Sequence, residues 1–172
     1  MKKVKFLTLG CKVNLYETEA MKGLFEKAGY EITESEDADV FVINTCTVTA
    51  MSDRKSRQMI RRAKKKNPKS IVAVVGCYSQ VSPEEVAKIE DIDIIMGTTD
   101  RTKIVEYVES FDGNRQNRVN AEIPKVFEDL KSTHQNRTRA TLKIQDGCRN
   151  FCTYCIIPFA RGPLRSKTLE ST

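Results

Sequence analysis

Three cysteines that lie close together in the sequence are the side chains best suited to do chemistry. Cys148, Cys152 and Cys155 follow a C-x3-C-x2-C spacing, so three thiolates fall within eight residues. Iron–sulfur clusters are held by cysteine thiolates, usually four to a cluster. A loop that supplies only three leaves one iron open to a further ligand, and this favours a cluster that binds something besides the protein.

A structural zinc loop is the main alternative for this motif. Structural zinc sites are closed, with four protein ligands, but no cysteine or histidine follows Cys155, and the single histidine, His134, lies well upstream. We therefore favour an iron–sulfur cluster over zinc, and we favour ordinary buried cysteines least. His134 lies in a polar stretch, where we expect a solvated side chain.

The other three cysteines, Cys11, Cys46 and Cys77, are far apart in the sequence but occupy equivalent places. Each follows an apolar run that predicts a β-strand, and these strands are expected at residues 4–9, 40–43 and 71–75. The carboxyl ends of parallel strands lie at one edge of an open α/β sheet, and ligands bind in the crevice there. The three thiols are therefore predicted to meet around one centre. The alternative is that each is a small buried apolar residue.

Helices expected between the strands complete an α/β pattern. Apolar residues at helical spacing predict a helix that follows Cys11 and ends at Gly29, and Asn14 with Glu17 three residues later is typical of an N-terminal capping box. Further helices are expected at 52–66, from Ser82-Pro83 onward and from about 99 to 111, with strands at 30–32 and 92–96. Strands that alternate with helices indicate a parallel sheet covered by helices on both faces.

The α/β pattern extends over residues 1–112, and we predict one domain there. Residues 113–137 are polar and rich in asparagine, which predicts a linker with at most one short helix around 126–130. A strand at 141–144 is then expected to open a second domain, over residues 138–172.

Cations crowd the predicted helix at 52–66, and Asp53 is its only acid. A solvated helix face usually carries i,i+4 ion pairs, although basic residues in the last turn also stabilise the helix dipole. The scarcity of acids favours contact with the phosphate backbone of a nucleic acid, which positions the partner without reading its sequence. The residues expected to make these contacts are Arg54, Arg57, Arg61, Arg62 and Lys65.

The composition permits a polyanionic partner and argues against a membrane protein. The net charge is +6, and no apolar run approaches the roughly 20 residues that span a bilayer. The apolar stretch at 6–9 is too short for the roughly 7–15-residue core of a secretory signal, so we expect a cytoplasmic protein without a membrane partner. Cysteines in that compartment more often bind metals than form disulfides.

Two motifs resemble those of a known enzyme family. The string Gly147-Cys148-Arg-Asn-Phe-Cys152-Thr-Tyr154-Cys155, followed by Pro158-x-x-Arg161-Gly162, resembles the cluster loop of radical S-adenosylmethionine (radical SAM) enzymes, and in particular of methylthiotransferases. The N-terminal string Thr8-Leu-Gly10-Cys11-Lys-Val-Asn14-Leu-Tyr16-Glu17-Thr-Glu19 is similar to the start of that family. Its Cys-Lys-Val-Asn form is closest to the branch that modifies N6-threonylcarbamoyladenosine in tRNA.

The resemblance implies an N-terminal methylthiotransferase α/β domain, followed by the first strand and the cluster loop of a radical SAM β/α barrel. It also implies two 4Fe–4S clusters, the second of which binds S-adenosylmethionine. The metal ligands that it implies are Cys11, Cys46 and Cys77 for one cluster and Cys148, Cys152 and Cys155 for the other. Tyr154 either packs on the adenine of the cofactor or only packs within the loop, and Arg161 either contacts substrate or cofactor or is a solvated surface residue.

The implied reaction of the complete enzyme is methylthiolation of carbon 2 of N6-threonylcarbamoyladenosine beside the tRNA anticodon. The implied partners are the tRNA anticodon stem-loop, an electron donor and a sulfur source. The alternatives are methylthiolation of isopentenyladenosine in tRNA or of a ribosomal-protein aspartate, and a non-catalytic iron–sulfur module that binds RNA.

A β/α barrel needs far more chain than follows the predicted linker. About 35 residues come after Arg137, whereas a closed barrel takes roughly 250, so we expect this chain to be an incomplete enzyme without activity of its own. Apolar residues of the cluster loop would then lack their barrel partners. We therefore expect residues beyond about 145 to be poorly ordered or held by another molecule.

Overall fold

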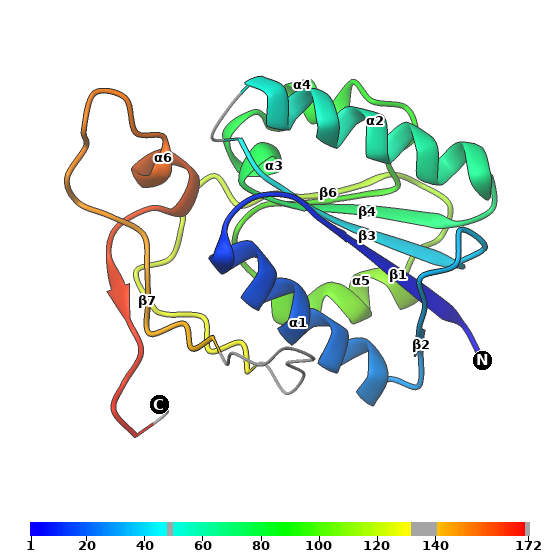
Figure 1. The fold of residues 1–172 in the computed structure, drawn as a ribbon, viewed down its shortest axis with the longest axis horizontal. Helices are drawn as coiled ribbons and strands as arrows, with labels where there is room; N and C mark the ends of the chain where they lie inside the picture. Colours follow the sequence, from blue (N-terminus) through cyan, green and yellow to red (C-terminus); the bar gives the residue numbers. More distant parts are fainter. Residues whose placement is uncertain (48–49, 132–140, 171–172) are drawn as a thin grey trace.

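A single parallel β-sheet forms the centre of the molecule. In the computed structural model the described residues are 1–47, 50–131 and 141–170, so that His134 lies outside them. The strands are β1 (Lys3–Thr8), β2 (Glu31–Ile32), β3 (Val40–Thr45), β4 (Ile71–Gly76), β5 (Ile94–Met96) and β6 (Gln116–Arg118), in the order β2-β1-β3-β4-β5-β6 (Figure 1). Every neighbouring pair is parallel. The predicted α/β class is therefore confirmed.

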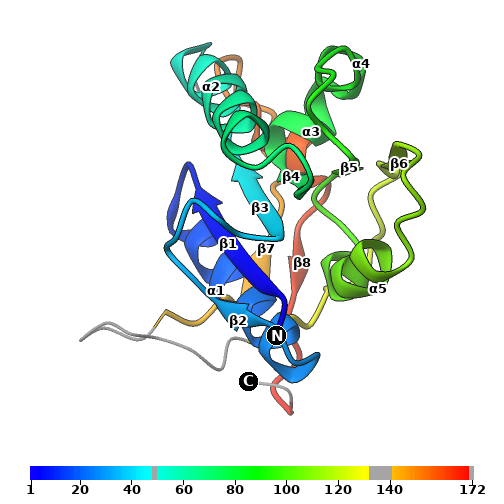
Figure 2. The ribbon, with the colours of Figure 1, turned by 90° about the vertical axis from the view of Figure 1, so that its right-hand side faces the viewer.

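Helices cover both faces of this sheet, as Figures 1 and 2 show. One face carries α1 (Lys12–Lys27), the 3-10 helix η1 (Arg101–Lys103) and α5 (Ile104–Glu109), and the other carries α2 (Ala50–Lys66), α3 (Cys77–Val81) and α4 (Pro83–Ala87). Each layer has its own apolar core. Met21 and Phe25 of α1 pack under Val4 and Phe6, whereas Ile60 of α2 belongs to the core on the other face.

The first helix does not begin as its sequence predicts. Cys11 is the N-cap residue of α1, and it makes no side-chain capping hydrogen bond. The predicted capping box of Asn14 and Glu17 is wrong, because both side chains lie within the helix and are buried, with 0% and 1% of their surface exposed. Their partners are in other parts of the fold. The end of the helix agrees with the prediction, since Gly29 has a φ of +85°.

Part of the predicted linker belongs to the sheet. Residues 116–118 form β6, which pairs with β5 in parallel, and this strand is too short and too polar to be recognised by periodicity. Further along, Leu130 is buried, and its carbonyl oxygen accepts a hydrogen bond of 2.8 Å from the Tyr16 hydroxyl. The division of the chain at residues 112 and 137 remains a prediction.

The segment 141–170, which we call the docked segment, packs against the α/β layer. It contains β7 (Gln145–Asp146), α6 (Ile157–Arg161) and β8 (Arg165–Ser166), and β7 pairs with β8 in antiparallel fashion. No strand forms at 141–144, so the position of that predicted strand is wrong. Helix α6 packs against α3, and Thr98 donates a hydrogen bond of 2.8 Å to the carbonyl oxygen of Ala160.

Residues 145–170 contact the α/β layer of the same chain, in contrast to the expectation of poor order or of a partner molecule beyond about 145. That expectation rests on apolar side chains, of which Phe151 and Phe159 are indeed 63% and 62% exposed. Polar side chains of the segment bind the α/β layer instead, and apolar patterning does not reveal such contacts. In the part of the chain that the structure describes, no helix is long and apolar enough to cross a membrane.

Candidate metal centre

The three N-terminal cysteines lie at the carboxyl ends of adjacent strands. Cys11 follows β1, Cys46 follows β3 directly, and Cys77 follows β4 as the first residue of α3. The chain leaves β1 toward β2 and leaves β3 toward β4, on opposite sides, so the gap between β1 and β3 is the topological switch point at which open α/β sheets bind ligands. Cys46 and Cys77 are buried, with 4% and 3% exposed, and Cys11 is exposed.

Two glycines keep the backbone close around these thiols. A Cβ atom on Gly10 would lie 2.8 Å from the Cβ and 3.1 Å from the Sγ of Cys46, so the loop before Cys11 touches Cys46. Gly76 has a φ of +105°, and a Cβ there would lie 2.5 Å from the carbonyl oxygen of Thr45. Both positions require glycine, because neither the backbone angle nor the space admits a larger residue.

The three thiols are soft ligands, and soft sulfur ligands favour zinc or iron–sulfur clusters. Burial raises the pKa of the Cys77 thiol, and the nearby Arg161 guanidinium opposes that effect. Among the described residues, however, no group of three His, Cys, Asp or Glu side chains is arranged to hold a metal ion as it stands. The structure thus brings the three strand ends together, and the roles of these cysteines as ligands remain predictions.

The second cysteine group forms an open loop on the docked segment. Cys152 is exposed, and Cys148 and Cys155 are partly exposed. The backbone N–H of Cys148 donates to the carbonyl oxygen of Gly162 at 3.1 Å, and that of Cys155 donates to Cys152 at 2.9 Å. Phe151 within the loop has a φ of +39°, which is unusual for a residue other than glycine.

Aromatic side chains of this loop face outward. The rings of Phe151 and Phe159 meet edge to face with centroids 5.8 Å apart. Tyr154 is 91% exposed, so its alternative role, in packing within the loop, is not seen here. A contact between Tyr154 and the adenine of S-adenosylmethionine remains a prediction.

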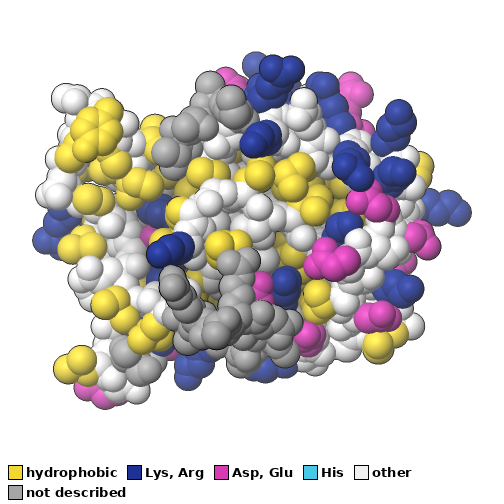
Figure 3. All heavy atoms as spheres, in the orientation of Figure 1, with side chains coloured by type: hydrophobic (Ala, Val, Ile, Leu, Met, Phe, Trp, Pro, Cys, Tyr) yellow, Lys and Arg dark blue, Asp and Glu magenta, His cyan; other side chains and the backbone are white. Residues whose placement is uncertain are grey.

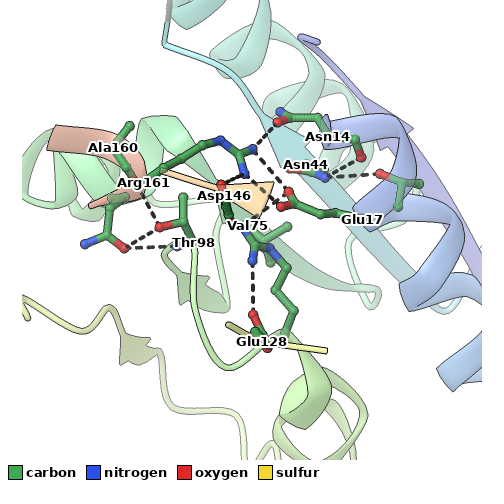
Figure 4. Close-up of polar contacts among 12 residues, drawn as sticks. Asn14, Glu17, Asn44, Val75, Thr98, Glu128, Asp146, Ala160 and Arg161 are labelled. Atoms are coloured by element: carbon green, nitrogen blue, oxygen red, sulfur yellow. Dashed lines mark hydrogen bonds and ion pairs between the residues drawn. The ribbon is translucent and has the colours of Figure 1, made fainter. Parts of the chain in front are cut away.

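A buried ion-pair network joins the start of α1 to the docked segment, and Figure 4 shows several of its members. At its centre is Glu17 of α1, which is 1% exposed. Its carboxylate accepts hydrogen bonds from Arg161 at 2.8 Å and from Lys143 at 2.7 Å, and it lies 3.2 Å from the Arg101 guanidinium. One carboxylate is therefore shared by cations from η1 and from both sides of the second cysteine loop.

Asp146 of β7 is the second anion of this network. It accepts from Arg161 at 3.1 Å and from Lys143 at 2.7 Å. The other Arg161 nitrogen, Nη2, donates to Asn14 at 2.7 Å. Arg161 is only 3% exposed, so the alternative of a solvated surface arginine is wrong, and its described contacts are with the protein itself.

The cations keep both carboxylates ionised. Burial by itself raises the pKa of Glu17, but the charges of Arg101, Arg161 and Lys143 outweigh it and hold that pKa well below its usual value. The pKa of Asp146 is lowered in the same way, because Arg161 and Lys143 outweigh its burial. Burial lowers the pKa of Arg161, but Glu17 and the other anionic groups around it, Asp146 among them, together outweigh burial and raise that pKa.

Sequence reasoning missed this network. Its members come from four separate stretches of chain: Asn14 and Glu17, Arg101, Lys143 with Asp146, and Arg161. The one available signal was that Asn14 and Glu17 occupy one helical turn directly after Cys11, while Arg161 follows the other cysteine group. In the sequence the same residues fit a helix cap, which is a local alternative.

The structure divides the basic residues of α2 into two sets. Arg57 donates to the Tyr78 hydroxyl at 2.9 Å, and Lys64 is paired with Asp93 at 2.7 Å, so these two cations have structural partners. Arg54, Arg61 and Lys65 are exposed, and their spacing of seven and four residues places them on one helix face. Figure 3 shows Lys and Arg side chains gathered over α2.

A shallow groove runs between this helix and the end of β1. It has a volume of about 330 Å³ and is lined by Leu9, Lys55, Gln58, Met59 and Arg62. Arg62 also lies 3.4 Å from the Glu36 carboxylate. The groove thus combines an apolar floor with cations, close to Cys11.

Fold and site together define an α/β domain with cysteines at its ligand-binding edge. Residues 3–97 match the family described as Uncharacterized protein family UPF0004. Because this match covers more than half of the chain, the chain belongs to that family.

Relatives extend the similarity through the second cysteine group. The chain is 54% identical over 175 residues to the threonylcarbamoyladenosine tRNA methylthiotransferase MtaB of Bacillus subtilis and 43% identical to that of Aquifex aeolicus, with 99% and 98% of this chain covered. It is 34% identical to the ribosomal protein uS12 methylthiotransferase RimO of Syntrophotalea carbinolica. The resemblance to methylthiotransferases, and within them to the threonylcarbamoyladenosine branch, is confirmed. The chain spans 39%, 42% and 39% of the lengths of these three relatives.

Replacing Gly76 by alanine is expected to destabilise the protein and to displace Cys77. The added Cβ meets a backbone oxygen that cannot move away cheaply, in addition to the strain of a positive φ, which costs about 1–3 kcal/mol. Gly113→Ala is the matched control, because Gly113 has a φ of +92° and open space around its Cβ position. Urea unfolding should show a larger loss of unfolding free energy for Gly76→Ala than for Gly113→Ala. Equal losses would contradict the close contact between Gly76 and the Thr45 carbonyl oxygen.

Replacing Glu17 by glutamine is expected to cost about 3–5 kcal/mol of unfolding free energy at pH 7, because it leaves buried cations without their anion. The folded-state pKa of Glu17 is depressed below its usual 4.5, so its contribution is complete above that pH and is lost as the pH falls through the folded value. Urea unfolding at pH 7 and pH 3 should therefore show a smaller difference between wild type and variant at pH 3. The exposed Glu84→Gln serves as the control, and an equally small effect of Glu17→Gln at pH 7 would refute the ionised network.

Proposed function

We propose that this chain is the N-terminal part of a radical SAM methylthiotransferase that modifies tRNA. The proposed reaction is methylthiolation of carbon 2 of N6-threonylcarbamoyladenosine beside the anticodon. The observation that carries the proposal is the pair of cysteine groups, one at the switch point of an α/β sheet and one in a loop bound to the same layer. Sequence identity of 54% to a threonylcarbamoyladenosine tRNA methylthiotransferase over 99% of the chain supports the choice of substrate.

Cys11, Cys46 and Cys77 are the proposed ligands of one 4Fe–4S cluster. Such a cluster, with one iron free of protein ligands, would supply the sulfur to be inserted. The protein contributes the placement of the thiols: β1, β3 and β4 are adjacent and in register, with Thr8 opposite Asn44 and Thr45 opposite Gly76, so that the chain delivers each cysteine to the same edge. Glycines before Cys11 and Cys77 allow the backbone to approach the neighbouring strand ends closely.

Cys148, Cys152 and Cys155 are the proposed ligands of the other cluster, together with S-adenosylmethionine. Cluster and cofactor would supply the one-electron chemistry that removes hydrogen from an inert carbon, while the protein supplies placement and exclusion of water. Tyr154, next to Cys155, is exposed and free to stack on the adenine. The exposed rings of Phe151 and Phe159 offer apolar surface beside the loop.

The exposed cations of α2 are proposed to bind tRNA phosphates. Arg54, Arg61 and Lys65 lie on one helix face, and the groove beside them ends near Cys11. Arg62 of the groove rim is a weaker candidate because of its pairing with Glu36, and Arg57 is weaker still because it binds Tyr78. A tRNA anticodon loop offers unstacked bases that an enzyme can draw into a pocket.

Other functions of the same class differ only in substrate. The chain is 32% identical to a tRNA-2-methylthio-N(6)-dimethylallyladenosine synthase of Dictyoglomus thermophilum and 34% to the ribosomal protein methylthiotransferase mentioned above, so the span itself is common to several substrates. A non-catalytic iron–sulfur module that binds RNA is the rival of a different class. Cleavage of S-adenosylmethionine by the longer protein would distinguish the two. An electron donor, a sulfur source and a cytoplasmic location remain predictions, as does the inactivity of this chain alone.

The cluster assignment predicts two independent iron sites. After anaerobic reconstitution, Cys46→Ala is expected to retain about half of the wild-type iron and sulfide, since each cluster takes its own set of thiolates. Cys152→Ala is the complementary variant and should lose the other half. Iron analysis with electron paramagnetic resonance (EPR) spectra measures both, and wild-type iron in either variant would refute the assignment of that cysteine.

The RNA contact predicts a loss of salt-dependent binding when α2 is reversed in charge. Changing Arg54, Arg61 and Lys65 to glutamate is expected to weaken tRNA binding and to flatten its salt dependence, because each phosphate contact contributes about 0.7–0.9 to the log–log slope. Filter binding or fluorescence anisotropy at several salt concentrations measures the slope.

A second triple variant separates contact from net charge. Lys2, Lys27 and Lys125 are also exposed and lie outside α2, so reversing them changes the net charge by the same amount. Only the α2 variant should show a flatter salt dependence of tRNA binding. Equal behaviour of the two variants would make the cations of α2 a solvated helix face.

A further inference from the structure

The buried network has one end at the N-terminal cysteines. The Asn14 side-chain amide donates to the carbonyl oxygens of Leu9 and Thr45 at 2.8 and 2.9 Å. Leu9 lies two residues before Cys11, and Thr45 directly precedes Cys46. Asn14 thus ties together the two strand ends that flank the switch point, and its remaining oxygen accepts from Arg161.

The other end of the network lies at the C-terminal cysteines. Asp146 accepts from the backbone N–H of Gly147 at 2.9 Å, directly before Cys148. The residue after Arg161, Gly162, accepts the backbone N–H of Cys148 at 3.1 Å. A Cβ on Gly147 would lie 2.5 Å from the Gly162 carbonyl oxygen, so the two chain segments are in tight contact there.

Arg161 connects these two ends. Its guanidinium donates to Asn14 and Glu17 of α1 and to Asp146 of β7, as Figure 4 shows for the labelled residues. A guanidinium presents its donors in a rigid planar fork, whereas an ammonium is a point charge on a flexible stem. Three acceptors held by one such fork have little freedom to move relative to one another.

Stability alone does not account for such an arrangement. Removing several charges from water costs free energy that their attraction only partly returns, and apolar replacements are often as stable. What a buried ion pair does provide is geometry, because its members tolerate few alternative arrangements. The network contains such pairs where the second cysteine loop meets the first cysteine site, in a segment whose large apolar side chains Phe151 and Phe159 are exposed.

We propose that Arg161 is a positioning residue that fixes the second cysteine group relative to the first, by joining Asn14 and Glu17 to Asp146. The docking rests on the observed hydrogen bonds and ion pairs, and its meaning for catalysis rests on the proposed function. Sulfur insertion would need a substrate carbon to meet both clusters, so their separation must be set by the protein. This network would set it before the remainder of any barrel adds contacts.

The first test needs no cofactor. In the reduced, metal-free chain, Cys77 is buried at the start of α3, against which α6 packs, and the exposed Cys11 is an internal reference. Alkylation is followed at a pH that ionises the thiol in both proteins, because the loss of Arg161 by itself raises the pKa of Cys77. Under that condition Arg161→Gln is expected to raise the alkylation rate of Cys77 by about tenfold or more, because breaking a buried ion pair costs more than the ~1.4 kcal/mol that corresponds to a factor of ten. Hydrogen exchange of residues 141–170 should rise in parallel, and mass spectrometry measures both.

A matched variant distinguishes docking from general loss of stability. Arg115 is likewise a hydrogen-bonded arginine, which donates to the carbonyl oxygens of Ile89, Glu90 and Ile92 away from the network. Arg115→Gln should leave the rate of Cys77 unchanged. No change in Arg161→Gln, or an equal rise in Arg115→Gln, would overturn the proposal. Arg161→Lys keeps the charge without the fork, and if the glutamine variant does not fold, a wild-type rate for Cys77 in the lysine variant overturns it instead.

The second test uses the reconstituted protein. Arg161→Gln is expected to keep the iron content of the wild type while the magnetic interaction between the two reduced clusters, seen as broadening in EPR spectra, is weakened. An unchanged interaction would overturn the positioning role. If the wild type takes up no iron, the proposed function fails, and the alkylation experiment still decides whether Arg161 holds the docked segment.

Discussion

A carboxylate that is almost fully buried stays ionised only if cations surround it, and Glu17 meets that condition with cations from three other parts of the chain. Arg101 belongs to the 3-10 helix η1, Lys143 precedes the second cysteine loop, and Arg161 follows that loop. None of these cations would be stable at that depth without the anion, because the desolvation of each is expensive. The arrangement of residues 141–170 on the α/β layer therefore depends on this one ion cluster more than on apolar contact.

The sheet positions the first cysteine group, and the ion-pair network positions the second cysteine loop beside it. Because β1, β3 and β4 are parallel, Cys11, Cys46 and Cys77 all follow strand ends at one edge of the sheet. The chain leaves β1 and β3 in opposite directions, and this places the switch point at that edge. The network then fills the space beside that edge with Asn14, Glu17 and Arg161, so the same turn of α1 that follows Cys11 also receives the second loop. As a helix cap, Asn14 would have hydrogen-bonded to backbone N–H groups of its own helix. Here the start of α1 has no side-chain cap, and Asn14 and Glu17 serve long-range contacts instead.

In the folded protein, some of the cations that crowd α2 are paired with distant residues. In the sequence, the cations of α2 form one crowded group with a single acid. In the fold, Lys64 reaches Asp93 near the start of β5 and Arg57 reaches Tyr78 of α3, so some of the apparent excess is paired over long range. Among the cations that remain exposed, Arg54, Arg61 and Lys65 lie on one face, and this is the surface that a polyanion could meet.

The sequence alone determined the fold class and the places of the cysteines, because both follow from local patterns. Continuous apolar runs such as 71–75 indicate buried strands, alternation with helices indicates a parallel sheet, and a cysteine just past each strand must then lie at the carboxyl edge. The C-x3-C-x2-C spacing is also local. Strands β6 and β7 could not be predicted in this way, since two or three polar residues carry no periodicity.

Only the tertiary structure decided the partners of Asn14, Glu17 and Arg161. The ion pair between Glu17 and Arg161 spans 144 residues, and a buried charge looks the same in sequence as a solvated one. Its burial depends on whether distant cations and anions arrive at one point, which is a property of the folded chain as a whole. For that reason the sequence indicated where the two cysteine groups lie, and the structure alone showed what holds one against the other.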